Sequence, residues 1–579
     1  MGTQLDYNFK TEPFSHQREE WLISRELPGR AIFWEQGTGK SKLTVDTACW
    51  MYQCGMIDAV VVVAPNGVHR NWVENEILDH TPDAIMAKTR AFAFQSAKAE
   101  TKWHKNAVRS VLQHSGLSWF AISYEGFMTN AGKRALTDFF DKRRTLYVLD
   151  ESHNIKSPEA ERTKSILRSA PYSAFRRLLT GTPIAQGPFD AYSQVQFLDR
   201  DFWARNGFAT FADFKVHFAT WKKIWNPHIR RTVKDPVTGL KRTVMGGEID
   251  AVASYRRLDE LQAILKTISS RVTKDEVLDL PPKLYTKHYV TLSPEQSRYY
   301  REMRDEYMVW LESSAPQEEA REVIAERASQ ASEHVCPVCS GTREVVSDGF
   351  IYPCFDCEPG DGAERLSEDV VVAELAMVRM LRLQQIICGY LPTDREGEPL
   401  HIIPGVNRRL MALCDNIEAR EGKTIVWARF QLDITLILEE LERRGISAVR
   451  YDGLVDDEAR ALAKARFQGE RPVRERGIVV GREPVPVEEQ AQVFVANPAA
   501  GATGLTLTVA RFVDYYSNNF KLIDRLQSED RAHRIGQTNK VLYTDYVAED
   551  TVDDKIVEAL RNKFNIATRI TGDRLKEWL

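Results

Sequence analysis

Short apolar runs alternate with amphipathic stretches of helical period in two separate parts of the chain. In the first part, about residues 12–200, the apolar runs are 30–34, 59–64, 119–124, 145–149 and 177–180. In the second part, about residues 400–548, they are 424–427, 448–451, 493–496, 512–516 and 541–547. Strands that alternate with helices in this way form a parallel sheet covered by helices. The sequence therefore predicts an α/β protein with two lobes of the same architecture.

A different pattern separates the two lobes. Residues 201–280 are rich in aromatic and basic side chains, and residues 295–311 and 368–388 each place apolar residues on one helical face. We expect the last two stretches to form an antiparallel helical pair, and the proline-containing residues 469–490 to be a loop insertion. The expected divisions are lobe 1 at 1–200, a helical and basic insertion with a linker at 201–292, a helical protrusion at 293–395, lobe 2 at 396–548 and a C-terminal helical brace at 549–579.

The composition narrows the class of protein. The 579 residues are 43% apolar and 28% charged, which is typical of a globular protein and excludes collagen-like, coiled-coil and wholly disordered chains. The formal net charge of −4 excludes a uniformly basic coat protein, so nucleic-acid binding would need a local basic surface. No apolar run approaches the ~20 residues of a membrane span, the N-terminus lacks a secretory signal pattern, and eight cysteines are too few for a disulfide scaffold. We expect a reduced, cytoplasmic chain without a membrane partner.

A glycine-rich segment follows the first apolar run. It reads Gly37-Thr38-Gly39-Lys40-Ser41 and precedes a helical pattern. Glycines let backbone N–H groups approach phosphate oxygens, and the N-terminus of a helix favours negative charge. Lys40 could then reach the β- and γ-phosphates of a nucleotide, and the Ser41 hydroxyl could ligate Mg²⁺. The alternative is a glycine-rich turn with a chance lysine.

Two adjacent carboxylates end a later strand of the same lobe. Asp150 and Glu151 follow the apolar run Leu146–Leu149. Asp150 lies where a Mg²⁺-bound phosphate should sit, at the carboxyl end of a strand, and Glu151 could orient and deprotonate a water molecule. A solvated acidic pair in a turn is the alternative. Because both parts of one site occur in one lobe, the sequence predicts hydrolysis at a phosphate group that is bound to Mg²⁺.

A family resemblance rests on motifs that occur in order along the chain. Asp150-Glu-Ser-His153 and Thr180-Gly-Thr-Pro183 resemble those of superfamily 2 helicase-like ATPases and, more narrowly, of the Swi/Snf-type DNA translocases. Further matching strings are Pro13–Arg18, Val61–Pro65 with Asn71-Trp72, Ile122–Glu125, Leu280–Lys283, Leu383–Cys388, Tyr451–Gly453, Gly501–Thr508 and Gln527–Gln537. The string from Trp34 to Ser41 departs from the family pattern, with Gln36 where methionine is usual, and so does Ser517–Phe520, where tryptophan is usual.

The resemblance implies two RecA-like lobes of a P-loop NTPase, ATP as the nucleotide and a role for each motif. Gln17 would contact the adenine base, and Arg531 and Arg534, three residues apart on one helical face, would be arginine fingers that stabilise charge on the transferred phosphoryl group. The residues that coupling of hydrolysis to lobe movement would use are His153, Thr180 and Thr182. The implied ATP-binding residues are Gln17, Gly37, Thr38, Gly39, Lys40, Ser41, Gln527 and Asp530.

Candidate DNA contacts gather in the basic insertion. Residues 215–245 contain eight basic residues and one acidic residue, and release of counterions from phosphates would drive binding there. A merely solvated charged face is the alternative. The helical spacing of Phe214, Phe218, Trp221 and Trp225 favours core packing over base stacking. The candidate contacts are Lys222, Lys223, Arg230 and Arg231, with Arg70, Asn71, Trp72, Thr503 and Thr508 as weaker ones.

Four cysteines form two Cys-x-x-Cys pairs within residues 336–357. Cys336 and Cys339 are separated by fourteen residues from Cys354 and Cys357. Four thiolates at this spacing suit tetrahedral Zn²⁺, and a site with four protein ligands is structural because no position is left for water. Redox-active or unligated thiols are the alternative.

These patterns together predict an ATP-dependent motor that moves along DNA, double-stranded and without sequence preference, as a monomer in a bacterial or virus-infected cytoplasm near the nucleoid. One alternative is a machine that displaces a protein, such as DNA-bound RNA polymerase, with the zinc element as the partner contact. Others are a strand-separating or annealing helicase and a nucleotide-gated binding module. The presence of Glu151, Arg531 and Arg534 argues against the binding module.

Overall fold

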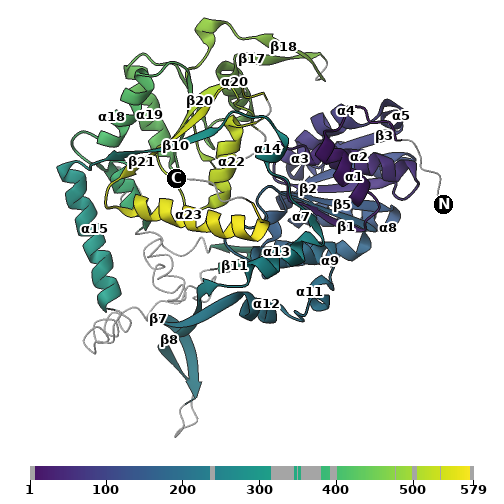
Figure 1. Cartoon of the computed structure of the whole chain (residues 1–579), viewed down its shortest axis with the longest axis horizontal. Coiled ribbons are helices and arrows are strands. Elements are labelled where there is room, and N and C mark those ends of the chain that lie inside the picture. The colour runs from purple at the N-terminus through teal and green to yellow at the C-terminus, as the bar shows by residue number, and fades with distance from the viewer. Residues whose placement is uncertain are drawn as a thin grey trace.

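The protein consists of two α/β lobes that lie side by side in Figure 1, joined by the linker between them and by the C-terminal helix. The computed structural model describes residues 7–234, 241–313, 344–347, 350–353, 380–391, 401–475, 478–498, 505–534 and 536–573. Two separate parallel sheets confirm the predicted fold class, and every apolar run predicted as a strand lies in one of them.

Lobe 1 is built on a seven-stranded parallel sheet with the order β3-β4-β2-β5-β6-β1-β9. The strands are β1 (Gly29–Ile32), β2 (Ala59–Ala64), β3 (Thr89–Ala93), β4 (Leu117–Ser123), β5 (Thr145–Asp150), β6 (Phe175–Leu179) and β9 (Ser269–Ser270). Strands β2, β4 and β5 are buried along their whole length because helices cover both faces. Helices α1 (Ser15–Ser24) and α2 (Lys40–Gln53) pack on one face, and α8 (Asn130–Lys142) and α10 (Asp190–Leu198) pack on the other.

Lobe 2 contains a six-stranded parallel sheet with the order β10-β21-β20-β15-β19-β16. The strands are β10 (Lys283–Val290), β15 (Lys423–Trp427), β16 (Ala448–Tyr451), β19 (Val493–Ala496), β20 (Ala510–Tyr515) and β21 (Val541–Ala548). Helices α18 (Arg408–Glu418) and α19 (Gln431–Arg443) cover one face, and α20 (Asp457–Gln468) and α22 (Leu522–Ala532) cover the other. Strand β10 thus belongs to this sheet, although the sequence placed it in the linker at 201–292. Strand β9, from the same range, joins the sheet of lobe 1.

The basic insertion is a long antiparallel hairpin and not a helix. Helix α12 (Phe211–Phe218) ends before β7 (Ala219–Lys234), which pairs with β8 (Lys241–Tyr255). Phe214 and Phe218 are fully buried in the core of lobe 1, whereas Trp225 is exposed on β7. Core packing is therefore confirmed for Phe214 and Phe218, whereas the helical period does not continue to Trp225, which lies on a strand.

The insertion expected as a loop in lobe 2 is likewise a hairpin. Strand β17 (Glu470–Glu475) pairs with β18 (Ile478–Pro484) in antiparallel register. Its prolines lie at Pro472 and at the strand end Pro484, and a two-stranded ribbon has open edges that tolerate the missing N–H groups.

The C-terminal helix α23 (Val552–Thr571) runs along both lobes in Figure 1. Ile556 and Leu560 pack in a core cluster of lobe 2, and Ile570 is buried in the core of lobe 1 beside α13 (Leu258–Lys266). Arg569 forms an exposed ion pair with Asp259 of α13 at 2.8 Å. The helix therefore ties the two lobes together.

The expected helical protrusion begins with α15 (Pro294–Ser313), and residues 380–387 are helical as well.

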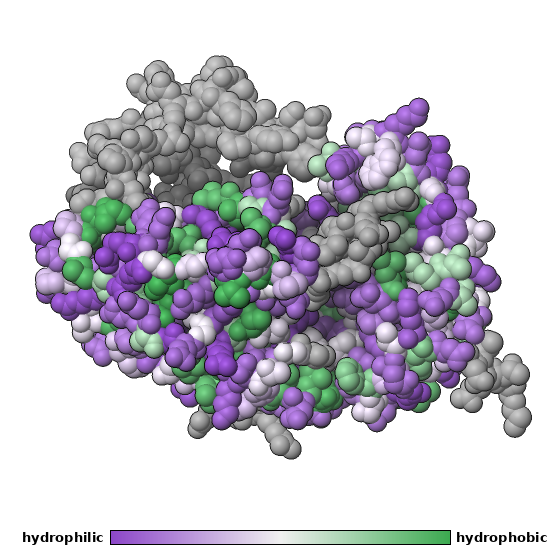
Figure 2. Space-filling model, turned by 90° about the horizontal axis from the view of Figure 1, so that it is seen from above, coloured by the Kyte–Doolittle hydropathy of each residue, from purple (hydrophilic) through white to green (hydrophobic). Residues whose placement is uncertain are grey.

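Hydrophilic side chains predominate on the face of the molecule in Figure 2, where apolar residues form scattered patches. Within the described ranges, no helix combines the length and the apolar character that crossing a membrane requires.

Candidate active site

The glycine-rich segment connects β1 to α2 with a backbone that suits phosphate. Gly37 and Gly39 have φ angles of 81° and 86°, a region that side chains disfavour, and helix α2 begins at Lys40. A Cβ atom on Gly39 would lie 1.9 Å from Gln17 Nε2. The first turn of α2, which contains the half-buried Ser41, directs its free N–H groups towards this loop. The geometry therefore supports the predicted anion site at residues 37–41.

Helix α1 holds this loop from one side. Gln17 Nε2 donates to the carbonyl of Thr38 at 3.2 Å, and the N–H of Phe14 donates to Gln17 Oε1 at 3.0 Å. His16 Nε2 lies 2.9 Å from the same Thr38 oxygen. Gln17 thus lies against the loop as predicted for this motif, while its contact with adenine stays a prediction.

Lys40 lies between the loop and the two carboxylates of β5. Its ammonium donates to the carbonyls of Trp34 at 2.9 Å and Glu35 at 3.1 Å. Burial lowers the pKa of Lys40, and the charges of Glu151 and Asp150 oppose that shift. A buried cation held beside two anions is suited to binding phosphate.

Asp150 ends β5 in a buried position. Its two carboxylate oxygens accept one bond each, from Trp72 Nε1 at 2.8 Å and from the N–H of Glu151 at 3.0 Å. Burial, and next to it the charge of Glu151, raise the pKa of Asp150 to about 6. A nearby cation would relieve both effects.

Glu151 adopts a left-handed conformation with φ of 52°, which turns its side chain into a ring of polar partners. It accepts from Gln36 Nε2 at 3.0 Å and from Thr180 Oγ1 at 3.3 Å, and His153 Nδ1 lies at 3.4 Å. Burial alone would raise the pKa of Glu151, but the His153 bond and the charges of Lys40 and Arg531 lower it below its usual range. The carboxylate is therefore ionised and able to accept a proton.

The predicted coupling residues form one chain of contacts with Glu151. His153 Nδ1 lies 3.2 Å from Thr180 Oγ1, which also accepts from the N–H of Thr182 at 3.1 Å. The structure thus brings the end of β5 and the segment after β6 together at the Glu151 carboxylate.

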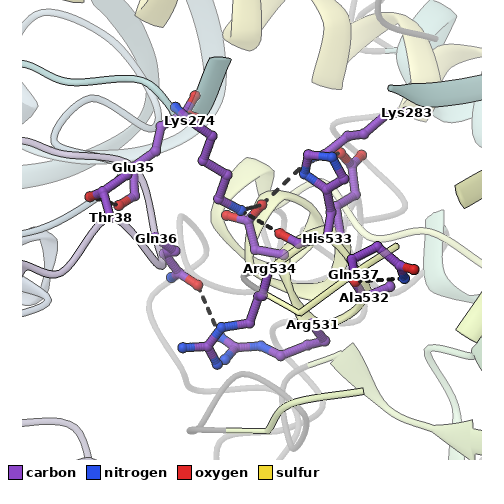
Figure 3. A network of polar contacts seen from close by, with 12 residues as sticks. Glu35, Gln36, Thr38, Lys274, Lys283, Arg531, Ala532, His533, Arg534 and Gln537 are labelled. Atoms are coloured by element: carbon purple, nitrogen blue, oxygen red, sulfur yellow. Dashed lines mark hydrogen bonds and ion pairs between the residues drawn. The ribbon is translucent and has the colours of Figure 1, made fainter. Parts of the chain in front are cut away.

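Lobe 2 supplies the two arginines from the end of α22, as Figure 3 shows. Arg531 Nη2 donates to Gln36 Oε1 of lobe 1 at 3.2 Å. Arg534 Nη1 donates to the carbonyl of Leu505 at 3.1 Å and to Thr506 Oγ1 at 3.2 Å, and its Nε lies 3.9 Å from the Cβ position of Gly37. Both guanidinium groups therefore face the phosphate loop across the boundary between the lobes.

Gln36 is a site residue that the sequence reasoning missed. Its amide donates to Glu151 and accepts from Arg531, so it links the carboxylate of lobe 1 to the arginine of lobe 2. One sign of this role was present in the sequence, because Gln36 stands where the family pattern usually has methionine. Lys274 was also missed: its ammonium bonds Asp530 Oδ1 at 2.6 Å. Of the predicted pair, Gln527 is buried in α22, whereas Asp530 forms an ion pair with Lys274 at the junction of the lobes.

The residues present fit a hard divalent cation. Asp150 offers carboxylate oxygens with remaining lone pairs, and Ser41 offers a hydroxyl at the first turn of α2, which are ligands that Mg²⁺ prefers. Asp150 and Ser41 are therefore the residues that would hold Mg²⁺.

A cleft of about 470 Å³ lies between the lobes next to His153. It is bounded by the loop after β5 and the loop before α22, with α23 along one side. Among the described residues that line the cleft, Asp524 is acidic and four are basic, namely Lys156, Arg162, Lys521 and Lys563. The cleft also contains Phe520, whose carbonyl accepts from Lys563 at 2.8 Å. Its charge suits a chain of phosphates, and no motif in the sequence placed these residues together.

The predicted DNA contacts have different outcomes. Lys222 and Lys223 are exposed on β7, and Arg230 and Arg231 lie farther along the same strand. The prediction for Trp72 is wrong: its side chain is buried and bonds Asp150, because a π-helical turn at Trp72–Glu76 directs it inward.

The weaker predicted DNA contacts differ in their exposure. Arg70 is exposed, Asn71 donates to Glu76 at 3.1 Å, and Thr508 is half-buried beside Gln537. Thr503 lies outside the described residues, as do the four cysteines Cys336, Cys339, Cys354 and Cys357.

Comparisons with known proteins point to one family. A family model described as the SNF2-related domain matches residues 16–336, more than half of the chain. The chain is 21% identical over 549 residues to a SWI/SNF-related matrix-associated actin-dependent regulator of chromatin of subfamily A, the DEAD/H box 1 homolog of Drosophila melanogaster, covering 94% of this chain and 58% of that protein. It is 22% identical to the ATP-dependent helicase FUN30 of Saccharomyces cerevisiae, over 93% of this chain and 45% of that protein.

A third relative, the DNA repair protein RAD5 of Yarrowia lipolytica, is 22% identical over 98% of this chain and 59% of its own length. The chain spans about half the length of the curated relatives it matches. Among solved structures, a Sulfolobus solfataricus SWI2/SNF2 ATPase core in complex with dsDNA is 18% identical, with a TM-score of 0.37 over 99% of this chain and 96% of that one.

Proposed function

Because the chain belongs to the SNF2-related family of helicase-like ATPases, we propose that it is a motor that hydrolyses ATP and moves along double-stranded DNA without sequence preference. The observation that carries the proposal is a catalytic site divided between the lobes. Lobe 1 contributes the phosphate loop and Glu151, and lobe 2 contributes Arg531 and Arg534. A site made in this way is complete only when the lobes are together, so hydrolysis can alternate with lobe movement.

The proposed catalytic step uses groups from both lobes. The phosphate loop and Lys40 bind the β- and γ-phosphates, and Asp150 and Ser41 would hold Mg²⁺, which would neutralise phosphate charge when bound. Glu151, whose carboxylate is held by Gln36 and Thr180, accepts a proton from the water that attacks the γ-phosphorus, and ADP is the leaving group. Arg531 and Arg534 stabilise the charge that develops on the transferred phosphoryl group.

Movement follows from what the two lobes share. Loss of the γ-phosphoryl group removes the contact that Arg531 and Arg534 would make with it, and this weakens the hold of one lobe on the other. If each lobe grips the same strand, one cycle of closing and opening advances the protein along it. The basic cleft beside His153 supports this arrangement, because both lobes line it and it adjoins the catalytic carboxylate.

A triplex-displacement assay tests the proposed movement. A labelled third strand is bound to a duplex, and a motor that tracks the duplex releases it in the presence of ATP. We expect release that requires ATP and is absent in the Glu151→Gln variant. Hydrolysis of ATP without release of the third strand, on duplexes of several lengths, would contradict translocation.

We further propose that Cys336, Cys339, Cys354 and Cys357 hold one structural Zn²⁺. The support is their spacing, which suits four thiolates around a tetrahedral ion. Metal analysis of freshly purified, reduced protein is expected to give one zinc per chain, and a Cys336→Ser/Cys339→Ser variant is expected to lose it. Protein without zinc would overturn the site.

A further inference from the structure

Lys274 stands at the junction of the two lobes. It opens the short helix α14 (Lys274–Val277), which follows β9 of the lobe 1 sheet and precedes β10 of the lobe 2 sheet. The residue is buried, with 3% of its surface exposed. A buried ammonium group needs anionic or carbonyl partners, and those of Lys274 belong to lobe 2, whereas its backbone N–H bonds lobe 1.

Its backbone is fixed to the segment that forms the phosphate loop. The N–H of Lys274 donates to Glu35 Oε2 at 2.7 Å. The carbonyl of Glu35 in turn accepts from Thr38 Oγ1 at 2.8 Å and from Lys40 Nζ at 3.1 Å. The Cε atom of Lys274 lies 3.9 Å from the Cβ position of Gly37, so its side chain passes beside the loop.

Its ammonium group reaches the segment of lobe 2 that carries the arginines. Nζ donates to Asp530 Oδ1 at 2.6 Å and to the carbonyl of His533 at 2.7 Å. Figure 3 shows the side chain of Lys274 extending towards His533. These two acceptors immediately precede Arg531 and Arg534. One side chain therefore fixes the backbone positions from which both arginines project.

The charges around Lys274 agree with this geometry. Burial lowers the pKa of Lys274 to about 8, an effect that Asp530 opposes and Lys283 increases. Burial would raise the pKa of Asp530, but the charges of Lys274 and Lys283 hold it at about 2. The pair is thus ionised at neutral pH, and charged hydrogen bonds of this kind are short and strong.

We infer that Lys274 is a positioning residue that places Arg531 and Arg534 against the phosphate loop when the lobes are together. The inference rests on the proposed hydrolysis of ATP. Without the ammonium group, the ion pair that Asp530 keeps among the described residues is the longer one with Lys283, at 3.5 Å, and the carbonyl of His533 loses a donor. The backbone that carries the arginines is then held less firmly, and a displacement of ~1 Å at a catalytic group can cost ~100-fold in rate.

Steady-state hydrolysis by the Lys274→Met variant of the full chain tests the inference. Methionine keeps most of the side-chain volume and removes the charge. We expect kcat to fall by about 100-fold and KM for ATP to change by less than about 3-fold, because the loss is confined to the transition state. Binding of a fluorescent ATP analogue should be near that of the wild type, and Lys274→Arg should recover most of the rate.

Arg569→Met is the matched control. It removes a cation of α23 that forms an exposed ion pair with Asp259 of α13. This variant is expected to keep the wild-type kcat. A general weakening of contact between the lobes would lower the rate in both variants.

Two results would overturn the inference while the wild-type enzyme remains active. One is an unchanged kcat in Lys274→Met, and the other is an equal loss of rate and of nucleotide binding. If Lys274→Met does not fold, Asp530→Asn removes the same bond from lobe 2 and should show the same loss of kcat. Where both single variants fold, the double variant should be no slower than either one. Inactive wild-type protein would count against the proposed function itself.

Discussion

The backbone conformation of Glu151 positions its carboxylate for the proposed role as a proton acceptor. Its positive φ directs the carboxylate into contact with Gln36 and Thr180. A non-glycine residue in this conformation costs of the order of 1 kcal/mol or more, and such strain persists where the surroundings hold it. The surroundings here keep the carboxylate ionised in a buried place, which a proton acceptor needs.

Replacing Glu151 by Gln is expected to lower kcat for ATP hydrolysis by about 1,000-fold, because the amide cannot accept the proton of water. The change is isosteric, and the bonds to Gln36 and Thr180 can partly persist. Binding of a fluorescent ATP analogue should stay within about 3-fold of the wild type. Single-turnover hydrolysis at the wild-type rate would rule out the role of Glu151.

The arginines are expected to matter for turnover more than for binding. Arg531→Ala and Arg534→Ala should each lower kcat by about 1,000-fold, since each guanidinium acts on charge that is present only in the transition state. Nucleotide affinity is the control measurement and should largely persist. Full ATPase activity in either variant would exclude that residue as a finger.

Residues whose chemistry follows from spacing could be predicted, and residues defined by contacts between lobes could not. The phosphate loop, Asp150, Glu151 and the arginines stand in strings that carry their own signal. Gln36 and Lys274 become site residues only because two distant segments meet, as in the bond between Gln36 and Arg531. Trp72 was misassigned because only the turn of the chain decides whether an aromatic side chain faces solvent or Asp150.

At the scale of elements, the parallel strands were predicted well because each is a continuous apolar run buried on both faces. The half-exposed strands carry a weaker signal. Strand β7 contains exposed Lys222, Lys223, Ile224 and Trp225 in succession, which has neither the period of a helix nor the alternation of a strand. Only its pairing with β8 shows that this segment is a hairpin.

The hairpin gives a prediction about DNA affinity. In the Lys222→Gln/Lys223→Gln variant, the slope of log K against log salt should become less steep by about 2, because two phosphate contacts are lost. Lys223 pairs with Glu248 at 3.0 Å on the exposed surface, a contact worth too little to keep it from a phosphate. Fluorescence anisotropy with a labelled duplex over a salt series measures the slope.

Lys105→Gln/Lys142→Gln is the matched control, since these exposed lysines lie on α6 (Lys102–Leu112) and on α8, outside the hairpin. This variant should keep the wild-type slope. Equal slopes for the hairpin variant and the wild type would show that β7 does not contact DNA.

At the scale of the whole molecule, the residues just beyond α23 contact lobe 1 near the phosphate loop. Arg271 donates to Asp573 through Nε at 2.8 Å and Nη2 at 2.6 Å. The same guanidinium donates to the carbonyls of Phe33 at 2.5 Å and Gly181 at 3.1 Å. The segments that follow β1 and β6 are thereby joined to Asp573, two residues beyond the end of α23.

Asp573→Asn should lower the free energy of unfolding by about 2 kcal/mol, because it weakens a bidentate charged pair that is largely buried. Arg569→Met removes an exposed pair on the same helix and should cost less than about 1 kcal/mol. Urea unfolding followed by tryptophan fluorescence compares the two. Equal effects of the two variants would contradict a special role for the Arg271 contact.

Steady-state hydrolysis of ATP with and without duplex DNA, single-stranded DNA and RNA, with Lys40→Ala as the blank, tests the proposed DNA motor directly. We expect strong stimulation by duplex DNA of unrelated sequences, because DNA held by both lobes would bring Glu151 together with Arg531 and Arg534. Stimulation mainly by single strands or RNA would contradict tracking of a duplex. Turnover that no nucleic acid changes would contradict a DNA motor altogether.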